Sequence, residues 1–151
     1  MFEKTLVAGW GDMDFNAHMR NTAFLDKSAD VRMMFFAEHG FPIEEFRQRR
    51  IGPVVRKDEI EYFREVQLLE AMRVALSLAG LADDGSRFVL RNEFRREDGT
   101  LIAVVSSAGG WLDLAARKLV APPEALLEAM RSLPRAEGFV VLPSSLRSGA
   151  G

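Results

Sequence analysis

The side chains best suited to acid–base or nucleophilic chemistry lie close together in residues 10–21, WGDMDFNAHMRN. This segment holds two carboxylates, two carboxamides and one of the two histidines of the chain. It lies between a short apolar run and a helix-like segment that starts near Asn21. The first turn of a helix presents backbone N–H groups that have no partner within the helix, and the helix dipole favours negative charge there. Carboxylate, amide, imidazole and free N–H groups would therefore converge on one small volume, which suits chemistry at a carbonyl group.

Asp14 is the leading catalytic candidate, because a carboxylate can act as a nucleophile or as a base that activates water. Asn16 can orient water or hydrogen-bond a carbonyl oxygen, and His18 can exchange protons near neutral pH. Each of the three also has a structural interpretation: Asp14 and Asn16 as turn residues, and His18 as a solvated loop histidine. The N–H groups of Asn21 and Thr22 at the start of the helix are the candidate oxyanion site.

Composition limits the functions that this chain can have. A length of 151 residues with 48% hydrophobic residues predicts one domain with a real core. Twenty basic and 22 acidic residues, with no long run of one sign, argue against nucleic acid as the main partner. The chain has no cysteine, so thiol nucleophiles, disulfides and cysteine-based metal sites are excluded. His18 and His39 are too far apart to suggest a metal site, and we expect neither a metal nor a cofactor.

Hydropathy along the chain predicts neither a signal peptide nor a membrane partner. The N-terminal residues MFEK lack the long apolar run of a signal peptide, and no stretch approaches the roughly 20 apolar residues of a membrane span. The absence of cysteine also fits a cytoplasmic location. We therefore expect a cytoplasmic protein.

The elements that must position the 10–21 loop follow from hydrophobic periodicity. A strand is predicted over residues 4–10, and a helix over 21–39, which Asn21 or Thr22 would cap. Phe24, Ser28 and Val31 fall on one face of this helix, and Gly40 suits its end. The period then changes to two, which predicts strands around residues 60–66, 74–78 and 88–94. Residues 101–111 are apolar on both alternating sets, which predicts a central strand.

Short turn signals connect these strands. Asp83-Asp84-Gly85 and Asp98-Gly99 are typical of hairpins, so the sheet should be antiparallel. A short helix is predicted from Pro122 to about Leu133. One central helix and a run of hairpin-linked strands form an α+β pattern. We expect a single domain over residues 1–143, followed by a disordered tail over 144–151.

Two motifs resemble known thioesterase families. Gly11-Asp12-Met13-Asp14 is similar to the G-D-x-D segment of 4-hydroxybenzoyl-CoA thioesterases, whose second aspartate is catalytic and corresponds to Asp14. Residues 14–21, DFNAHMRN, resemble the D-x-N-x-H-x-N-N segment of acyl-ACP thioesterases, in which Asn16 and His18 match catalytic residues. Both families have the hotdog fold, in which a long central helix is wrapped by a curved antiparallel sheet of about five strands. The resemblance implies hydrolysis of an acyl-CoA or acyl-ACP thioester.

A third motif adds Glu65. The segment IEYFREV at residues 60–66 resembles L-E-Y-R-R-E-C of acyl-ACP thioesterases, in which the second glutamate lies at the active site. Val66 stands in place of the cysteine, so a thiol mechanism is not available. The structural alternative is a solvated strand glutamate that pairs with Arg64 or Arg73.

The chain departs from both families, and other functions stay open. Arg20 replaces the first asparagine of the N-N pair, and Asn16-Ala17 replaces a glycine of the 4-hydroxybenzoyl-CoA type. One alternative is a hotdog hydratase or dehydratase, although Asp14 and His18 lack the five-residue spacing of those enzymes. Another is an acyl-binding module without catalytic activity.

The expected partners are the acyl carrier and further copies of the chain. The chain is half the size of a two-hotdog acyl-ACP thioesterase, so we expect a homodimer or homotetramer. Arg49 and Arg50, in a cluster of cations between residues 47 and 57, are candidates for contacts with the phosphates of CoA. The alternative is an exposed polar loop.

Overall fold

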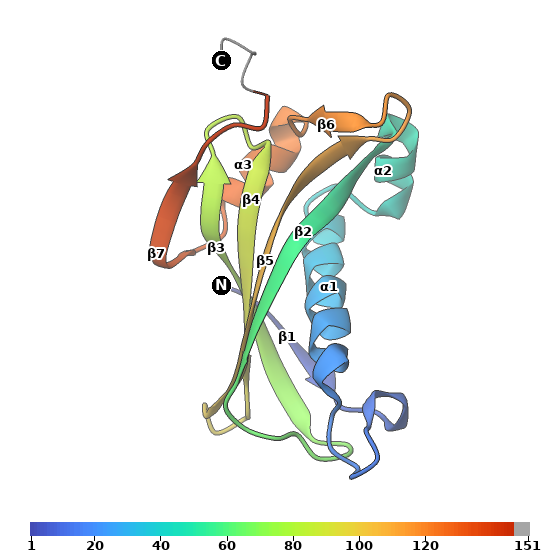
Figure 1. The fold of residues 1–151 in the computed structure, drawn as a ribbon, viewed down its shortest axis with the longest axis vertical. Helices are drawn as coiled ribbons and strands as arrows, with labels where there is room; N and C mark the ends of the chain where they lie inside the picture. The colour runs from blue at the N-terminus through green and yellow to red at the C-terminus, as the bar shows by residue number, and fades with distance from the viewer. Residues whose placement is uncertain (147–151) are drawn as a thin grey trace.

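The computed structural model describes residues 1–146, in which a curved sheet lies against one face of the helix α1 (Figure 1). The strands are β1 (Phe2–Val7), β2 (Ile51–Tyr62), β3 (Ala71–Ala82), β4 (Arg87–Arg95), β5 (Leu101–Asp113), β6 (Lys118–Val120) and β7 (Arg135–Leu142). The helices are α1 (Asn21–Glu38), α2 (Ile43–Arg49), α3 (Glu124–Arg131) and the 3-10 turn η1 (Trp10–Asp12).

The sheet has the strand order β1-β3-β4-β5-β2, and neighbouring strands along this path are antiparallel. Two tight turns join β3 to β4 and β4 to β5, at the predicted positions. Gly85 and Gly99 adopt φ values of 76° and 91° in these turns, a region that glycine enters without steric cost. The antiparallel sheet around one helix agrees with the fold that the resemblance implies.

Helix α1 packs its apolar face against the inner face of the sheet, as the periodicity predicts. Phe24, Ser28, Val31 and Phe35 are all at most 2% exposed. The rings of Phe24 and Phe94 meet edge to face, with centroids 5.2 Å apart. This packing holds the first turn of α1, and therefore the loop before it, at one end of the sheet (Figure 1).

The predicted cap of α1 is wrong. Arg20, not Asn21 or Thr22, precedes the helix in an extended conformation, and no side chain accepts a hydrogen bond at this cap. The Thr22 hydroxyl instead accepts a hydrogen bond from Arg20 Nε at 3.1 Å. The first backbone N–H groups of α1 are therefore left without a side-chain cap.

Two further expectations need correction at the C-terminal end. Strand β7 was not predicted, and it pairs in parallel with β3, so the sheet is not purely antiparallel. Ser144 and Ser145, expected to be in a disordered tail, make hydrogen bonds with the β3–β4 turn: Ser144 Oγ donates to Asp84, and the Ser145 N–H donates to Ser86 Oγ at 3.0 Å. The rest of the predicted tail, residues 147–151, lies outside the described residues.

Candidate active site

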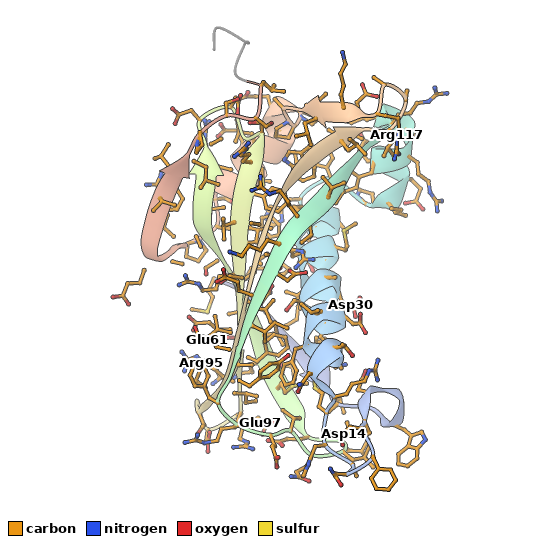
Figure 2. All side chains as sticks on the ribbon, viewed as in Figure 1. Asp14, Asp30, Glu61, Arg95, Glu97 and Arg117 are labelled. Atoms are coloured by element: carbon orange, nitrogen blue, oxygen red, sulfur yellow. The ribbon has the colours of Figure 1, made fainter. Side chains whose placement is uncertain are left out.

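Asp14 shapes a small loop at the end of the sheet where α1 begins (Figure 2). One carboxylate oxygen, Oδ1, accepts hydrogen bonds from the N–H of Asn16 at 2.8 Å and of His18 at 3.1 Å. The Asp14 N–H donates to the His18 carbonyl at 2.8 Å, and Ala17 turns the chain with φ 61°. Within residues 1–146, Oδ2 of this exposed carboxylate accepts no hydrogen bond. One oxygen of Asp14 is thus fixed by the backbone, and the other is open to solvent.

Asp12 has a different environment two residues earlier. Its carboxylate accepts hydrogen bonds from the Gly9 N–H at 2.8 Å and from the Lys27 ammonium on α1 at 2.9 Å. Burial alone would raise the pKa of Asp12, but the bonds from Lys27 and Gly9 and the charges of Lys27 and Arg20 outweigh it and lower that pKa. Asp12 therefore fastens the loop to the helix.

Arg20 connects the loop to the first turn of α1. Its guanidinium donates to the Gly11 carbonyl and to Thr22 Oγ1, and it lies 3.5 Å from the Asp26 carboxylate. The Arg20 N–H also donates to the Asp12 carbonyl at 2.8 Å. These contacts hold the Asp14 loop in place beside the helix N-terminus.

The structure brings His18 and Glu65 together from distant parts of the chain. His18 Nε2 lies 3.3 Å from Glu65 Oε2. The two segments run side by side, because the Met19 N–H donates to the Val66 carbonyl at 2.9 Å. Glu65 pairs with neither Arg64 nor Arg73, the partners expected if it were only a surface glutamate.

Glu65 does not lie on a strand, which corrects the prediction for residues 60–66. β2 ends at Tyr62, and Glu65 belongs to the loop before β3. Arg96 holds this loop: it donates to the Glu65 carbonyl at 2.7 Å and to the Glu70 carboxylate at 2.7 Å. The hydrogen bonds from Arg96 thus fix the backbone of residues 63–70, which positions the Glu65 side chain.

The first turn of α1 borders the site, together with the Asp14 loop and the loop that carries Glu65. The N–H groups of Asn21 and Thr22 donate to no group among residues 1–146, and both residues are exposed. The Tyr62 hydroxyl donates to the Asn21 carbonyl at 3.2 Å, which anchors β2 to this turn. The Asn16 side chain makes no hydrogen bond in the described part of the chain and is free to contact a ligand.

Arg49 and Arg50 are not near this site. They end α2, at the opposite end of α1 from the Asp14 loop (Figure 1). With 18 residues, α1 separates the two ends by about 27 Å. Arg49 is also paired with Glu45 at 2.8 Å, and Arg50 binds the turn after β5 through its carbonyl. Within one subunit the structure does not bring these arginines together with the catalytic candidates.

Sequence reasoning did not identify three residues that hold the site, Arg20, Tyr62 and Arg96. In the sequence, Arg20 stands out only as a departure from a family motif. Nothing local marks Arg96, because its partners lie in a loop far away in the sequence.

In the described part of the chain, no group of three or more histidine or acidic side chains is arranged to hold a metal ion, and no helix is long and apolar enough to cross a membrane.

Comparison with known families adds one finding to this geometry. A sequence profile described as the thioesterase-like superfamily matches residues 8–130, most of the chain. The chain belongs to the thioesterase-like superfamily. This membership supports hydrolysis of a thioester as its general activity. No protein of curated function matches the chain.

Solved structures share the fold of this thioesterase-like chain at low sequence identity. A gentisyl-coenzyme A thioesterase is 18% identical with a TM-score of 0.76, covering 85% of this chain and 98% of its own. A 1,4-dihydroxy-2-naphthoyl-CoA thioesterase from Synechocystis is 16% identical with a TM-score of 0.78, covering 87% and 96%. A Staphylococcus aureus hypothetical protein in complex with CoA is 21% identical with a TM-score of 0.79, covering 99% and 94%. These likenesses confirm the hotdog fold.

Proposed function

We propose that this protein hydrolyses an acyl-CoA thioester, with Asp14 as the nucleophile or as the base that activates water. The observation that carries the proposal is the state of the Asp14 carboxylate. Two backbone N–H groups fix Oδ1, while Oδ2 accepts no hydrogen bond within residues 1–146. The loop orients the carboxylate through hydrogen bonds to Oδ1 alone. Oδ2 therefore remains available to a carbonyl carbon or to a water molecule.

The neighbouring groups suit the other needs of this reaction. The negative charge that develops on the thioester oxygen would be stabilised by the N–H groups of Asn21 and Thr22, where the helix dipole also favours an anion. Asn16 would orient the acyl carbonyl or water. His18 would supply or accept a proton, and Glu65 would orient its ring through the 3.3 Å contact.

The carrier in this proposal is CoA rather than ACP. Two of the relatives above are described as thioesterases of aromatic acyl-CoA substrates, and a third was solved with CoA. A hydratase or dehydratase has less support, because Asp14 contacts the backbone of His18, whereas the His18 ring faces Glu65.

Self-association is part of the proposal. Large apolar side chains are exposed around the candidate site: Trp10, Phe15, Tyr62, Phe63, Leu68 and Leu69. β2, with 12 residues, is an edge strand of the sheet in the described chain, and edge strands present unpaired backbone groups. We infer that a second copy pairs along β2 and covers these side chains, in a homodimer or homotetramer. The site would then lie between subunits.

Asp14→Asn is the direct test of the mechanism. The amide oxygen can still accept hydrogen bonds from Asn16 and His18, so the loop should keep its shape. Basicity and negative charge are lost, so kcat for an acyl-CoA should fall on the order of 10²–10⁴-fold. KM should change much less. The assay is thiol release from a panel of acyl-CoAs, together with a melting curve on the same preparation.

Asp12→Asn is the matched control in the same loop. It removes the same charge two residues away, from a carboxylate that binds Lys27, and should retain most of the activity. A folded Asp14→Asn protein that hydrolyses acyl-CoA within a few-fold of the wild-type rate would refute the mechanism.

A further inference from the structure

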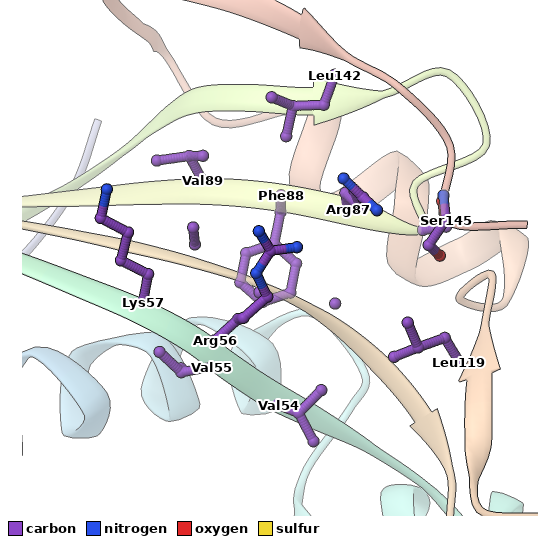
Figure 3. A pocket seen from close by; sticks show the side chains of 14 residues that line it. Val54, Val55, Arg56, Lys57, Arg87, Phe88, Val89, Leu119, Leu142 and Ser145 are labelled. Carbon is purple, nitrogen blue, oxygen red and sulfur yellow. The ribbon is translucent and has the colours of Figure 1, made fainter.

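A cavity lies on the face of the sheet that is turned away from α1 (Figure 3). Its volume of about 440 Å³ is within the size range of small-ligand sites. The Phe88 ring packs on Trp111 in the core, so the next residue on β4, Val89, points to the opposite, outer face. Val89 pairs with Ala108, and Ala108 pairs with Lys57, so these three side chains share the outer face. The cavity is therefore separate from the core beneath α1.

The cavity is also remote from the Asp14 loop of the same subunit. Val54 lines it near the start of β2, whereas Tyr62, at the end of β2, bonds Asn21 at the start of α1. Eight residues of strand separate Val54 from Tyr62, about 26 Å at the rise of an extended chain. Tyr62 also points to the inner face, where its ring meets Phe24 of α1. A small ligand in the cavity would not reach the catalytic candidates of that subunit, so the cavity needs an explanation of its own.

The floor of the cavity is apolar. Leu142, at the end of β7, packs over β3, where a Cβ on Gly80 would lie 3.3 Å from the Leu142 side chain. Gly80 pairs with Val89, so Leu142 covers the outer face beside β4. The apolar side chains that line the cavity come from β2, β4, β5, β6 and β7: Val54, Val89, Ala108, Leu119 and Leu142. Such a surface favours contact with an apolar group over contact with water.

Three cations border this floor: Arg56, Lys57 and Arg87. Arg56 has no partner in the β2–β5 register, which shifts between Val55 and Lys57, and such bulges change the direction of a side chain. Lys57 pairs with Glu59 at 2.7 Å. In the described part of the chain, Arg56 and Arg87 form no ion pair and no side-chain hydrogen bond, and no acidic side chain lines the cavity. Two uncompensated positive charges thus lie beside an apolar surface (Figure 3).

The charges and the floor together define the chemistry of a ligand. A carboxylate can accept two hydrogen bonds from one guanidinium, and an anion would relieve the repulsion between two arginines that line one cavity. An alkyl or aryl group attached to the carboxylate would cover the floor. Because Lys57 is paired, only two positive charges are available, which suits one small anionic head rather than a chain of phosphates.

We propose that this cavity binds a free amphiphilic carboxylic acid in its ionised form. The carboxylate lies at Arg56 and Arg87, and the apolar tail lies on the floor formed by Val89, Ala108 and Leu142. This second site goes beyond the proposed thioester hydrolysis and does not depend on it.

A titration followed by methyl NMR tests what binds and where. The probe is octanoate, and its controls are 1-octanol, which lacks the charge, and acetate, which lacks the tail. Octanoate should shift the methyl signals of Val89, Ala108 and Leu142 at concentrations at least about tenfold lower than either control. The methyl group of Ala17, in the Asp14 loop, reports separately on binding at the candidate active site.

Substitutions separate the two parts of the site. The Arg56→Gln, Arg87→Gln double variant should weaken octanoate binding at least about tenfold and leave the weaker binding of 1-octanol unchanged. Ala108→Leu fills the floor and should weaken the binding of both. The matched control is Arg47→Gln, an exposed position on α2, which packs on the core side of the sheet through Phe46. This control should bind octanoate like the wild type.

Three results would overturn the proposal. The first is octanoate that shifts Ala17 but leaves Val89 and Leu142 unchanged. The second is octanoate binding that the double arginine variant does not alter, or 1-octanol that binds as tightly as octanoate. The third is CoA that displaces octanoate from Val89 and Leu142, which would assign the cavity to the carrier. Because the readout is binding, a protein that cleaves no thioester would refute the proposed function and leave this test intact.

Discussion

Asp12 and Asp14 lie two positions apart in one loop, and their contacts separate their roles. Asp12 is bound by an ammonium group from α1 and by a backbone N–H, which lower its pKa despite burial. Asp14 is bound only by N–H groups of its own turn, and it keeps an oxygen facing solvent. A carboxylate with its charge already satisfied stabilises the fold, whereas one with a free oxygen can take part in a reaction.

The pKa of Asp12 predicts how stability depends on pH. Because the folded-state pKa lies below the ordinary value of 3.8, ionised Asp12 stabilises the fold above that pH. This contribution is lost as the pH falls through the lowered pKa. Asp12→Asn should therefore reduce the free energy of unfolding at pH 7 by about 1–2 kcal/mol.

Urea unfolding of both proteins at pH 7 and pH 3 measures this effect. The difference in unfolding free energy between wild type and Asp12→Asn should be larger at pH 7 and shrink at pH 3. A difference that stays constant with pH would show that Lys27 does not stabilise the Asp12 carboxylate.

At the scale of elements, the contact between β2 and β5 depends on backbone proximity. Gly109 faces Val55 across the bulge, and its missing Cβ leaves room for the Val54 carbonyl. Gly109→Ala should force the two strands apart and reduce the free energy of unfolding by about 1–3 kcal/mol. Gly52→Ala, on β2 itself, is the control: its Cβ would meet only the Leu114 side chain at 3.8 Å. Thermal unfolding of both variants should separate them, and equal melting temperatures would contradict this account.

At the scale of the whole molecule, the exposed apolar side chains around the Asp14 loop and the free edge of β2 predict self-association. Sedimentation at micromolar concentration should give at least twice the chain mass of 16.9 kDa. Specific activity should fall on dilution into the monomer range, because the site would lose the side that the second subunit provides. A monomer with full activity would contradict the prediction.

The sequence alone determined the elements whose cause is local. Apolar spacing at a period of 3.6 predicts α1 almost to its ends. Alternation predicts β3 and β4, a run that is apolar on both sets predicts β5, and Asp-Gly sequences predict the turns between them. The loop from Asp12 to Asn21 could be identified as a candidate site, because its polar residue types are adjacent in the chain. Side-chain periodicity and turn chemistry act over a few residues, so they can be read without the fold.

Only the tertiary structure decided which distant groups meet. It places Glu65 on His18 and outside a strand, and it moves Arg49 and Arg50 to the far end of α1. It adds β7 in parallel beside β3, which a short apolar run before the C-terminus did not reveal. It also gathers Arg56 and Arg87 from two strands over one cavity. These contacts depend on strand order, on a bulge and on the curvature of the sheet, which arise from packing between distant segments rather than from any local pattern.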